Sequence, residues 1–143
     1  GFDAIVIGAG PAGEVCAGHL ADNGMRVAVA ERELVAGECS YWACMPSKTL
    51  LRGAAALRAA RDVDGARQAV TGGLDVAATL ARRDAIVHDW NDDGQVAWLR
   101  SADIDLVRGT GRLSGEREVT VESASGAGRE ECSTQDHCSS DHD

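Results

Sequence analysis

The fold is decided by the stretch Asp3-Ala-Ile-Val-Ile-Gly8-Ala-Gly10-Pro-Ala-Gly13. Its first half is a short apolar run, rich in β-branched residues and ended by glycine, which is typical of a strand buried on both faces. Apolar positions at helical spacing follow from Pro11 to Asn23, and a second strand-like run extends from Arg26 to Glu31. Strand, helix and strand within about 30 residues form a βαβ unit. This unit predicts an α/β fold with a Rossmann-type parallel sheet.

The glycines of this stretch have the spacing G-x-G-x-x-G, and the expected helix starts among them. Gly8 allows a tight turn, Gly10 lets the backbone approach a pyrophosphate, and Gly13 lets helix and strand pack closely. Negative charge is favoured at the helix amino terminus by N–H groups that lack helical acceptors and by the helix dipole. Glu31 ends the next strand, where its carboxylate can accept hydrogen bonds from the adenosine ribose hydroxyls. The motif therefore predicts a dinucleotide site.

A second motif, Cys39-Ser-Tyr-Trp-Ala-Cys44-Met-Pro-Ser-Lys48, begins eight residues after Glu31. Zinc is disfavoured because no histidine lies near the two cysteines, and inert core cysteines are disfavoured by the Pro-Ser-Lys continuation. Good helix formers dominate from Ala43 to about Arg61, so Cys44 is predicted at a helix amino terminus, one turn before the only lysine of the chain. Both features favour its thiolate form, which is the nucleophile in disulfide exchange.

Together the two motifs resemble the pyridine nucleotide-disulfide oxidoreductases, over roughly Phe2 to Val121. The resemblance implies an FAD-dependent oxidoreductase whose full-length parent is a homodimer. In such a parent, electrons pass from NAD(P)H through the flavin to a Cys39–Cys44 disulfide and on to a small-molecule disulfide or related acceptor. It also implies that Cys39 is the interchange thiol, Cys44 the charge-transfer thiol, and Lys48 the lysine near the flavin N5. The implied cofactor-binding residues are Gly8, Gly10, Pro11, Ala12, Gly13, Glu31, Arg32 and Lys48.

Some residues depart from the family pattern. Glu38 places a carboxylate beside Cys39, which is expected to raise the pKa of that thiol and to disfavour anionic substrates. Tyr41 and Trp42 are bulkier than the residues common between the two cysteines. The family's nicotinamide and dimerisation regions are also not found, so we expect a truncated, incomplete FAD domain without multiple turnover. Two alternatives stay open: a nucleotide-binding Rossmann module without redox turnover, and a relic that does not fold stably.

Composition limits the remaining classes of function. The chain has 143 residues, of which 44% are hydrophobic, enough for the core of one globular domain. The net charge of -9 disfavours nucleic acid and anionic membrane surfaces as partners. There is no apolar run of about 18 residues, and the five cysteines are an odd number, which disfavours a disulfide-stapled secreted domain. We therefore expect a cytoplasmic protein.

The remaining sequence predicts further elements and a tail. Helices are expected from Val76 to about Val87 and from Gln95 to Ala102, then a strand at Ile104–Arg108 and a ribbon of Arg112–Leu113 with Glu118–Glu122. Cys16 is interpreted as a core residue, and His19 and His88 as surface or boundary residues. Residues 1–123 are expected to form the partial FAD-binding domain, and residues 124–143 a disordered, non-native tail. Within that tail, no metal site is expected at the histidine and cysteine side chains, which are Cys132, His137, Cys138 and His142.

Overall fold

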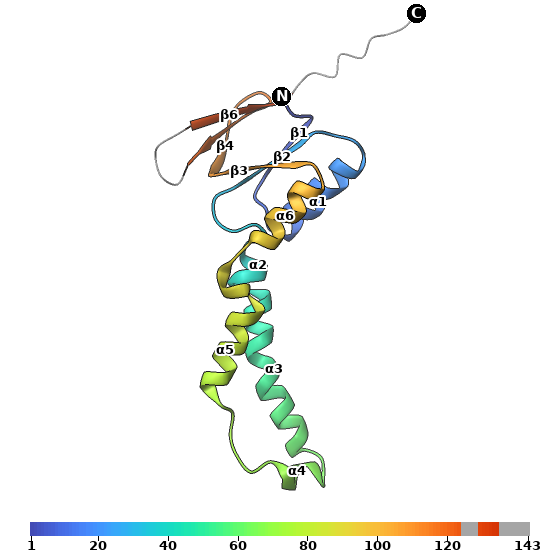
Figure 1. Ribbon diagram of the computed structural model, residues 1–143, viewed down its shortest axis with the longest axis vertical. Coiled ribbons are helices and arrows are strands. Elements are labelled where there is room, and N and C mark those ends of the chain that lie inside the picture. The colour runs from blue at the N-terminus through green and yellow to red at the C-terminus, as the bar shows by residue number, and fades with distance from the viewer. Residues whose placement is uncertain (124–128, 135–143) are drawn as a thin grey trace, which may run out of the picture. The chain divides into compact units, whose positions relative to one another are not determined.

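The computed structural model describes residues 1–123 and 129–134 (Figure 1). Within it, the chain forms two compact units. The first, here called the sheet unit, combines Gly1–Gly37 with the chain from Asp93 onward, and the second, the hairpin unit, is Glu38–Asp92. Each unit is built around its own packing of helices or strands.

The sheet unit contains a parallel sheet with strand order β1-β2-β3, which confirms the predicted α/β fold. All five residues of the central strand β2 are buried. The unit's elements are β1 (Ala4–Ile7), α1 (Pro11–Asp22), β2 (Val27–Glu31), α6 (Asp93–Ser101), β3 (Ile104–Arg108), β4 (Thr110–Gly115), β5 (Glu118–Glu122) and β6 (Arg129–Ser133). The sequence predicts all of these except β6, with the exact bounds of β3 and β5 and with bounds that differ by one or two residues for the others.

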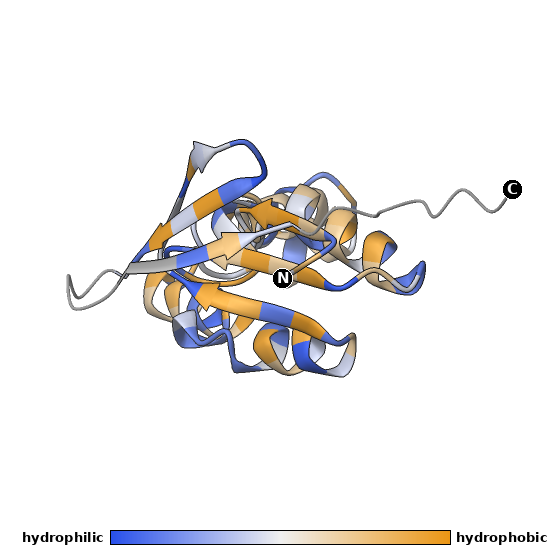
Figure 2. Ribbon diagram, turned by 90° about the horizontal axis from the view of Figure 1, so that it is seen from above, coloured by the Kyte–Doolittle hydropathy of each residue, from blue (hydrophilic) through white to orange (hydrophobic). Residues whose placement is uncertain are grey.

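Side chains that alternate along the strands build two separate cores. Val27 and Val29 of β2 pack with Ala17 of α1 and Leu99 of α6, so both helices cover the same face of the sheet. Leu99 is fully buried, and burial of a leucine side chain stabilises a fold by roughly 1.5–3 kcal/mol. On the other face, Ala30 packs against residues of the second sheet. The hydrophobic residues recur along the strands in Figure 2.

The second sheet is antiparallel, with strand order β4-β5-β6. The predicted disorder is wrong for β6, which pairs with β5 along its whole length. Cys132 of this strand is 5% exposed and packs with Val119 and Val121 of β5. The segment lacks aliphatic side chains, but backbone pairing supplies its register and a cysteine packs as a small apolar residue. The rest of the predicted tail, residues 124–128 and 135–143, lies outside the described residues.

The face that α1 turns to the sheet differs from the predicted one. Cys16 is exposed, so its assignment to the core is wrong, whereas the adjacent Ala17 is fully buried. Gly13 touches the end of β1, and in a helix the residues at i+4, i+7 and i+8 follow on the same face. These are Ala17, Leu20 and Ala21, which pack in the core. His19 and His88 are exposed, as expected.

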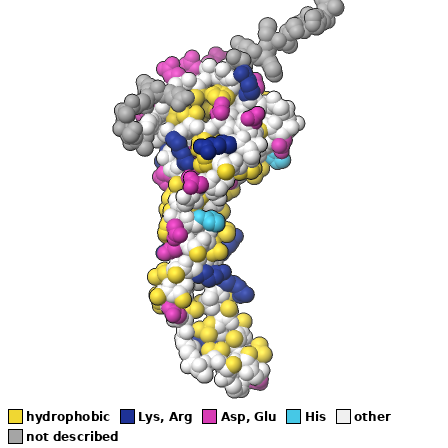
Figure 3. Space-filling model, in the orientation of Figure 1, with side chains coloured by type: hydrophobic (Ala, Val, Ile, Leu, Met, Phe, Trp, Pro, Cys, Tyr) yellow, Lys and Arg dark blue, Asp and Glu magenta, His cyan; other side chains and the backbone are white. Residues whose placement is uncertain are grey.

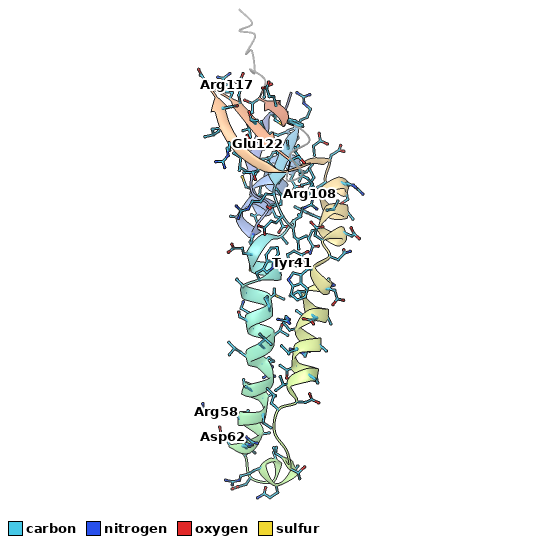
Figure 4. All side chains as sticks on the ribbon, turned by 90° about the vertical axis from the view of Figure 1, so that its left-hand side faces the viewer. Tyr41, Arg58, Asp62, Arg108, Arg117 and Glu122 are labelled. Atoms are coloured by element: carbon cyan, nitrogen blue, oxygen red, sulfur yellow. The ribbon has the colours of Figure 1, made fainter. Side chains whose placement is uncertain are left out.

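The hairpin unit is helical, and its two main helices, α3 and α5, lie side by side (Figures 1 and 4). Arg82 of α5 donates a hydrogen bond of 3.1 Å to the backbone carbonyl of Thr49 in α3. The unit's elements are α2 (Gly37–Tyr41), α3 (Cys44–Arg61), α4 (Ala66–Ala69), α5 (Val76–Ile86) and the 3-10 helix η1 (His88–Trp90). The sequence predicts α3 and α5 but not the three short helices, which are too short to show a period.

Large apolar side chains lie at the surface of the hairpin unit (Figure 3). Leu51 is 69% exposed and Val76 is 67% exposed. Among the described residues, no helix combines the length and the apolar character needed to cross a membrane.

Candidate functional site

The glycine loop between β1 and α1 leaves open space in front of the helix. Gly8 has a φ of 95°, a left-handed conformation that favours glycine. A Cβ atom built on Gly10 would meet no atom within 4 Å. The first helical hydrogen bond runs from the Glu14 N–H to the Gly10 carbonyl at 2.9 Å, so the N–H groups of Ala12 and Gly13 precede it without helical acceptors. The loop therefore offers backbone donors beside free space, which suits an anion.

Two close contacts hold this loop in shape. A Cβ atom on Gly13 would lie 1.9 Å from the Gly8 carbonyl oxygen, so only glycine allows helix and strand to meet there. A Cβ atom on Gly37 would lie 2.9 Å from the Gly10 Cα, and the Ala36 N–H donates a hydrogen bond of 2.7 Å to the Ala9 carbonyl. The loop after β2 therefore packs on the glycine loop, a contact that the sequence did not reveal.

Glu31 lies at the carboxyl end of β2 and is only 8% exposed. Its carboxylate accepts hydrogen bonds from two backbone N–H groups, that of Ala9 at 2.7 Å and that of Glu33 at 2.8 Å. A carboxylate offers about four lone-pair positions, so two of them are used by these bonds. The structure thus brings together the predicted phosphate loop and the predicted ribose acceptor.

Two arginines flank the segment after β2. Arg32, a predicted cofactor-binding residue, has a side chain that is 65% exposed and forms an ion pair with Glu33 at 3.6 Å. Its direct role toward a cofactor stays a prediction. Arg108 at the end of β3 donates a hydrogen bond to the Glu33 carbonyl and so supports this segment (Figure 4). Sequence analysis missed Arg108, because its partner lies 75 residues away.

The two predicted redox cysteines lie together in the hairpin unit. Cys39 belongs to α2, and Cys44 is the first residue of α3, as the sequence predicts. Between them the carbonyl of Glu38 accepts hydrogen bonds from the backbone N–H groups of Trp42, at 2.9 Å, and Ala43, at 2.6 Å. Both cysteines are half-buried free thiols, and the Cys44 side chain raises the pKa of Cys39. The turn therefore places the two thiols near each other.

The thiol of Cys39 has a pKa above its ordinary value. The main cause is the hydrogen bond with Cys44, followed by partial burial and by the charge of the Cys44 thiolate, and Lys48 acts in the opposite direction. The sequence predicts the correct direction but the wrong cause, because it assigns the effect to Glu38. Glu38 is an exposed side chain, and water screens its charge.

Lys48 lies one helical turn after Cys44, and its side chain is exposed. Residues i and i+4 share one face of a helix, so the ammonium group lies on the face that carries Cys44. Pro46 is buried in the same turn, where a proline is tolerated because that N–H would lack a helical acceptor. The helix start thus combines a thiol with a cation whose charge lowers the pKa of Cys39.

Tyr41 has a structural role that the sequence did not reveal. It stands between the two cysteines, is 1% exposed, and donates a hydrogen bond of 3.2 Å from its hydroxyl to the backbone carbonyl of Asn91. The adjacent Trp42 is 47% exposed, with its ring centroid 5.7 Å from that of Tyr41. The bulk of these residues is visible in the sequence, but the acceptor lies 50 residues away.

The family model of the pyridine nucleotide-disulphide oxidoreductases matches residues 2–134. The chain belongs to this family. Among the similar proteins, the dihydrolipoyl dehydrogenase of Chlamydia trachomatis is 36% identical over 121 residues, which are 84% of this chain and 26% of that protein. The dihydrolipoyl dehydrogenase of Bacillus subtilis is 34% identical over 115 residues, or 80% of this chain and 24% of that protein.

A solved structure has a similar fold. It is the Cu(II) complex of the HOCl-induced flavoprotein disulfide reductase RclA from Escherichia coli, with a TM-score of 0.71 at 24% identity over 91% of this chain and 26% of that one. The chain therefore spans about a quarter of the length of these relatives. The α/β fold with a parallel sheet, which the sequence predicts, agrees with membership of this family.

Proposed function

We propose that this chain is the FAD-binding and dithiol-bearing part of an enzyme that passes electrons from NAD(P)H through flavin to a Cys39–Cys44 disulfide. The observation that carries the proposal is the short turn that places Cys39 in α2 and Cys44 at the start of α3, where the Cys44 side chain raises the pKa of Cys39. The same chain has a glycine loop with open space over Gly10. The parent enzyme would be a homodimer. Its acceptor would be a small-molecule disulfide or a related compound.

The sheet unit supplies residues that fit the adenosine diphosphate half of FAD. The open space over Gly10 admits a pyrophosphate, and the N–H groups of Ala12 and Gly13 point along the helix axis toward it. Glu31 retains acceptor capacity for ribose hydroxyls beside the two backbone donors that already fix its carboxylate. Pro11 begins the helix without an N–H of its own, which costs nothing at this position.

When bound, FAD would supply a two-electron carrier between nicotinamide and the cysteine pair. Two electrons and two protons convert the Cys39–Cys44 disulfide into two thiols. The Cys39 thiolate then attacks one sulfur of an acceptor disulfide, so the acceptor S–S bond breaks, a mixed disulfide forms and one thiolate leaves. The Cys44 thiolate attacks the Cys39 sulfur, which re-forms the Cys39–Cys44 disulfide and releases the second acceptor thiol.

Because the pKa of Cys39 is raised, the exchange requires a group that favours the thiolate form of Cys39. A thiol with a raised pKa is mostly protonated near neutral pH, and only the thiolate attacks a disulfide. A base that removes the Cys39 proton, or the nearby Lys48 ammonium that stabilises the thiolate, would therefore speed the exchange.

The proposal is tested by adding FAD to the purified chain and recording visible absorbance after removal of free flavin. We expect a bound flavin spectrum and, after reduction of the cysteine pair, a long-wavelength absorbance band from the Cys44 thiolate against the flavin. A matched Cys44→Ser variant should keep the flavin and lose the band. A chain that retains no flavin at saturating FAD would contradict the proposal and favour a nucleotide-binding module without redox turnover.

A further inference from the structure

The turn that carries the cysteine pair is anchored at one buried side chain. Tyr41 comes two residues after Cys39 and three before Cys44. It is the largest fully buried side chain among the described residues. Its hydroxyl donates to the Asn91 carbonyl, on the segment that follows η1 (Figure 4). We call this hydrogen bond the Tyr41 tether.

We propose that the Tyr41 tether is a positioning device that holds Cys39 and Cys44 close and thereby stabilises their disulfide relative to the dithiol. The inference rests on the proposed redox function of the pair. Tyr41 does not contact the reacting sulfurs in this role and acts through the backbone of the turn. No other side chain of the turn combines such burial with a hydrogen bond to a distant segment, among the residues described.

The local geometry explains why such an anchor is needed. The turn changes direction at Ala43, whose φ of -119° and ψ of -89° fall outside the helical region, so α2 and α3 are not one continuous helix. The hydrogen bonds that Trp42 and Ala43 donate to the Glu38 carbonyl are local. The Tyr41 tether is the contact that joins this turn to a segment 50 residues away. A turn restrained at both ends and at its centre loses less conformational entropy when its sulfurs are joined.

The conformational entropy of the dithiol decides in which direction loss of the tether shifts the dithiol–disulfide equilibrium. With the tether present, the dithiol is held in a short turn that places Cys39 in α2 near Cys44 at the start of α3. Without it, the dithiol gains conformations in which the sulfurs are apart, while the covalently closed disulfide gains fewer. Loss of the tether therefore favours the dithiol, and the pair becomes a stronger oxidant.

The experiment measures the dithiol–disulfide equilibrium of the full chain in glutathione redox buffers, by alkylation and mass spectrometry. Tyr41→Phe keeps the ring and removes the hydroxyl donor. We expect its equilibrium constant for disulfide formation to fall roughly threefold to tenfold, which corresponds to a rise of about 15 to 30 mV in reduction potential. The control is Trp42→Phe, the exposed neighbouring ring, which should stay within about twofold of the wild type.

A second measurement works on the wild-type chain and does not depend on the stability of a variant. Tyr41 is the only tyrosine, so a chain labelled with ¹³C at the phenol Cζ gives one resonance. Because coupling between two events is reciprocal, a tether that favours the disulfide is itself strengthened by the disulfide. The Cζ resonance should therefore move between the oxidised and reduced chain.

The outcomes separate this inference from the proposed function. A wild-type chain that forms no Cys39–Cys44 disulfide at any glutathione ratio would overturn the redox function itself. A wild-type disulfide whose equilibrium constant is the same in Tyr41→Phe would overturn the tether alone. A Cζ resonance at one position in both redox states would also overturn it.

Discussion

The carboxylate of Glu31 accepts a hydrogen bond of 2.7 Å from the backbone N–H of Ala9, 22 residues earlier in the chain. The bond joins the carboxyl end of β2 to the glycine loop before α1, so this side chain shapes the loop. Glu31 is also the acceptor that we propose for the ribose hydroxyls. These two roles can be separated by comparing two substitutions.

Glu31→Ala removes both the loop acceptor and the ribose acceptor, and we expect FAD affinity to weaken by on the order of 1 to 3 kcal/mol for lost charge-assisted hydrogen bonds. Glu31→Gln keeps one uncharged oxygen acceptor, so its loss should be smaller. Flavin fluorescence during titration measures both affinities. Equal affinity of Glu31→Ala and the wild type would show that this carboxylate does not contact the cofactor.

Gly10→Val should abolish dinucleotide binding while the chain keeps its fold. The φ of -74° and ψ of -179° at Gly10 are open to any residue, and an added Cβ meets no atom within 4 Å. The valine would fill the space that a pyrophosphate needs. Circular dichroism melting should match the wild type, and flavin absorbance after gel filtration should be absent. Normal flavin retention by Gly10→Val would rule out the assigned binding mode.

Gly13→Ala should lower the stability of the fold, in contrast to Gly10→Val. Its Cβ would lie 1.9 Å from the Gly8 carbonyl oxygen, so the backbone of β1 or α1 must move. Overpacking of this kind costs about 1–3 kcal/mol of unfolding free energy. The same melting experiment should show a lower midpoint for Gly13→Ala than for Gly10→Val. The reverse order would mean that the helix does not pack on β1 through this glycine.

Cys39 and Cys44 should form a disulfide under air, because the short turn between α2 and α3 separates them by only four residues and places both as free thiols near the start of α3. Alkylation of the native chain without reductant, followed by mass spectrometry, should find this pair protected and the exposed Cys16 labelled. Cys16 therefore serves as an internal control for reagent access. Full labelling of all three residues in air-exposed native protein would contradict the prediction.

The alkylation rate of reduced Cys39 should show a pH dependence set by its neighbours. A raised pKa means that Cys39 stays protonated, and therefore slow to react, to a higher pH than an ordinary thiol. Cys44→Ala removes the main cause of the raised pKa, so the rate profile should move to lower pH. Lys48→Met removes the cation that lowers this pKa, so its profile should move to higher pH. Iodoacetamide rates between neutral and alkaline pH check both directions, and shifts of the same sign in the two variants would refute the assigned causes.

Local patterns in the sequence were sufficient for the parts of the molecule that depend on neighbouring residues. The apolar run before Gly8, the glycine spacing and the position of Glu31 predicted the βαβ unit, and the C-x4-C motif predicted a thiol at the start of α3. These features depend on hydrogen bonds and spacing between residues that are close in the sequence. Periodic sequence patterns therefore predict them directly. The family membership follows from the same two motifs.

Tertiary structure alone decided which side chains are buried and which distant residues meet. Cys16 faces solvent because the contact of Gly13 with Gly8 sets the rotation of α1, and Cys132 is buried because β6 pairs with β5. The Tyr41 hydroxyl meets the Asn91 carbonyl across 50 residues, a pairing with no local signature. Burial and long-range hydrogen bonds depend on how whole elements pack, whereas a sequence pattern reports only which residues stand near one another along the chain.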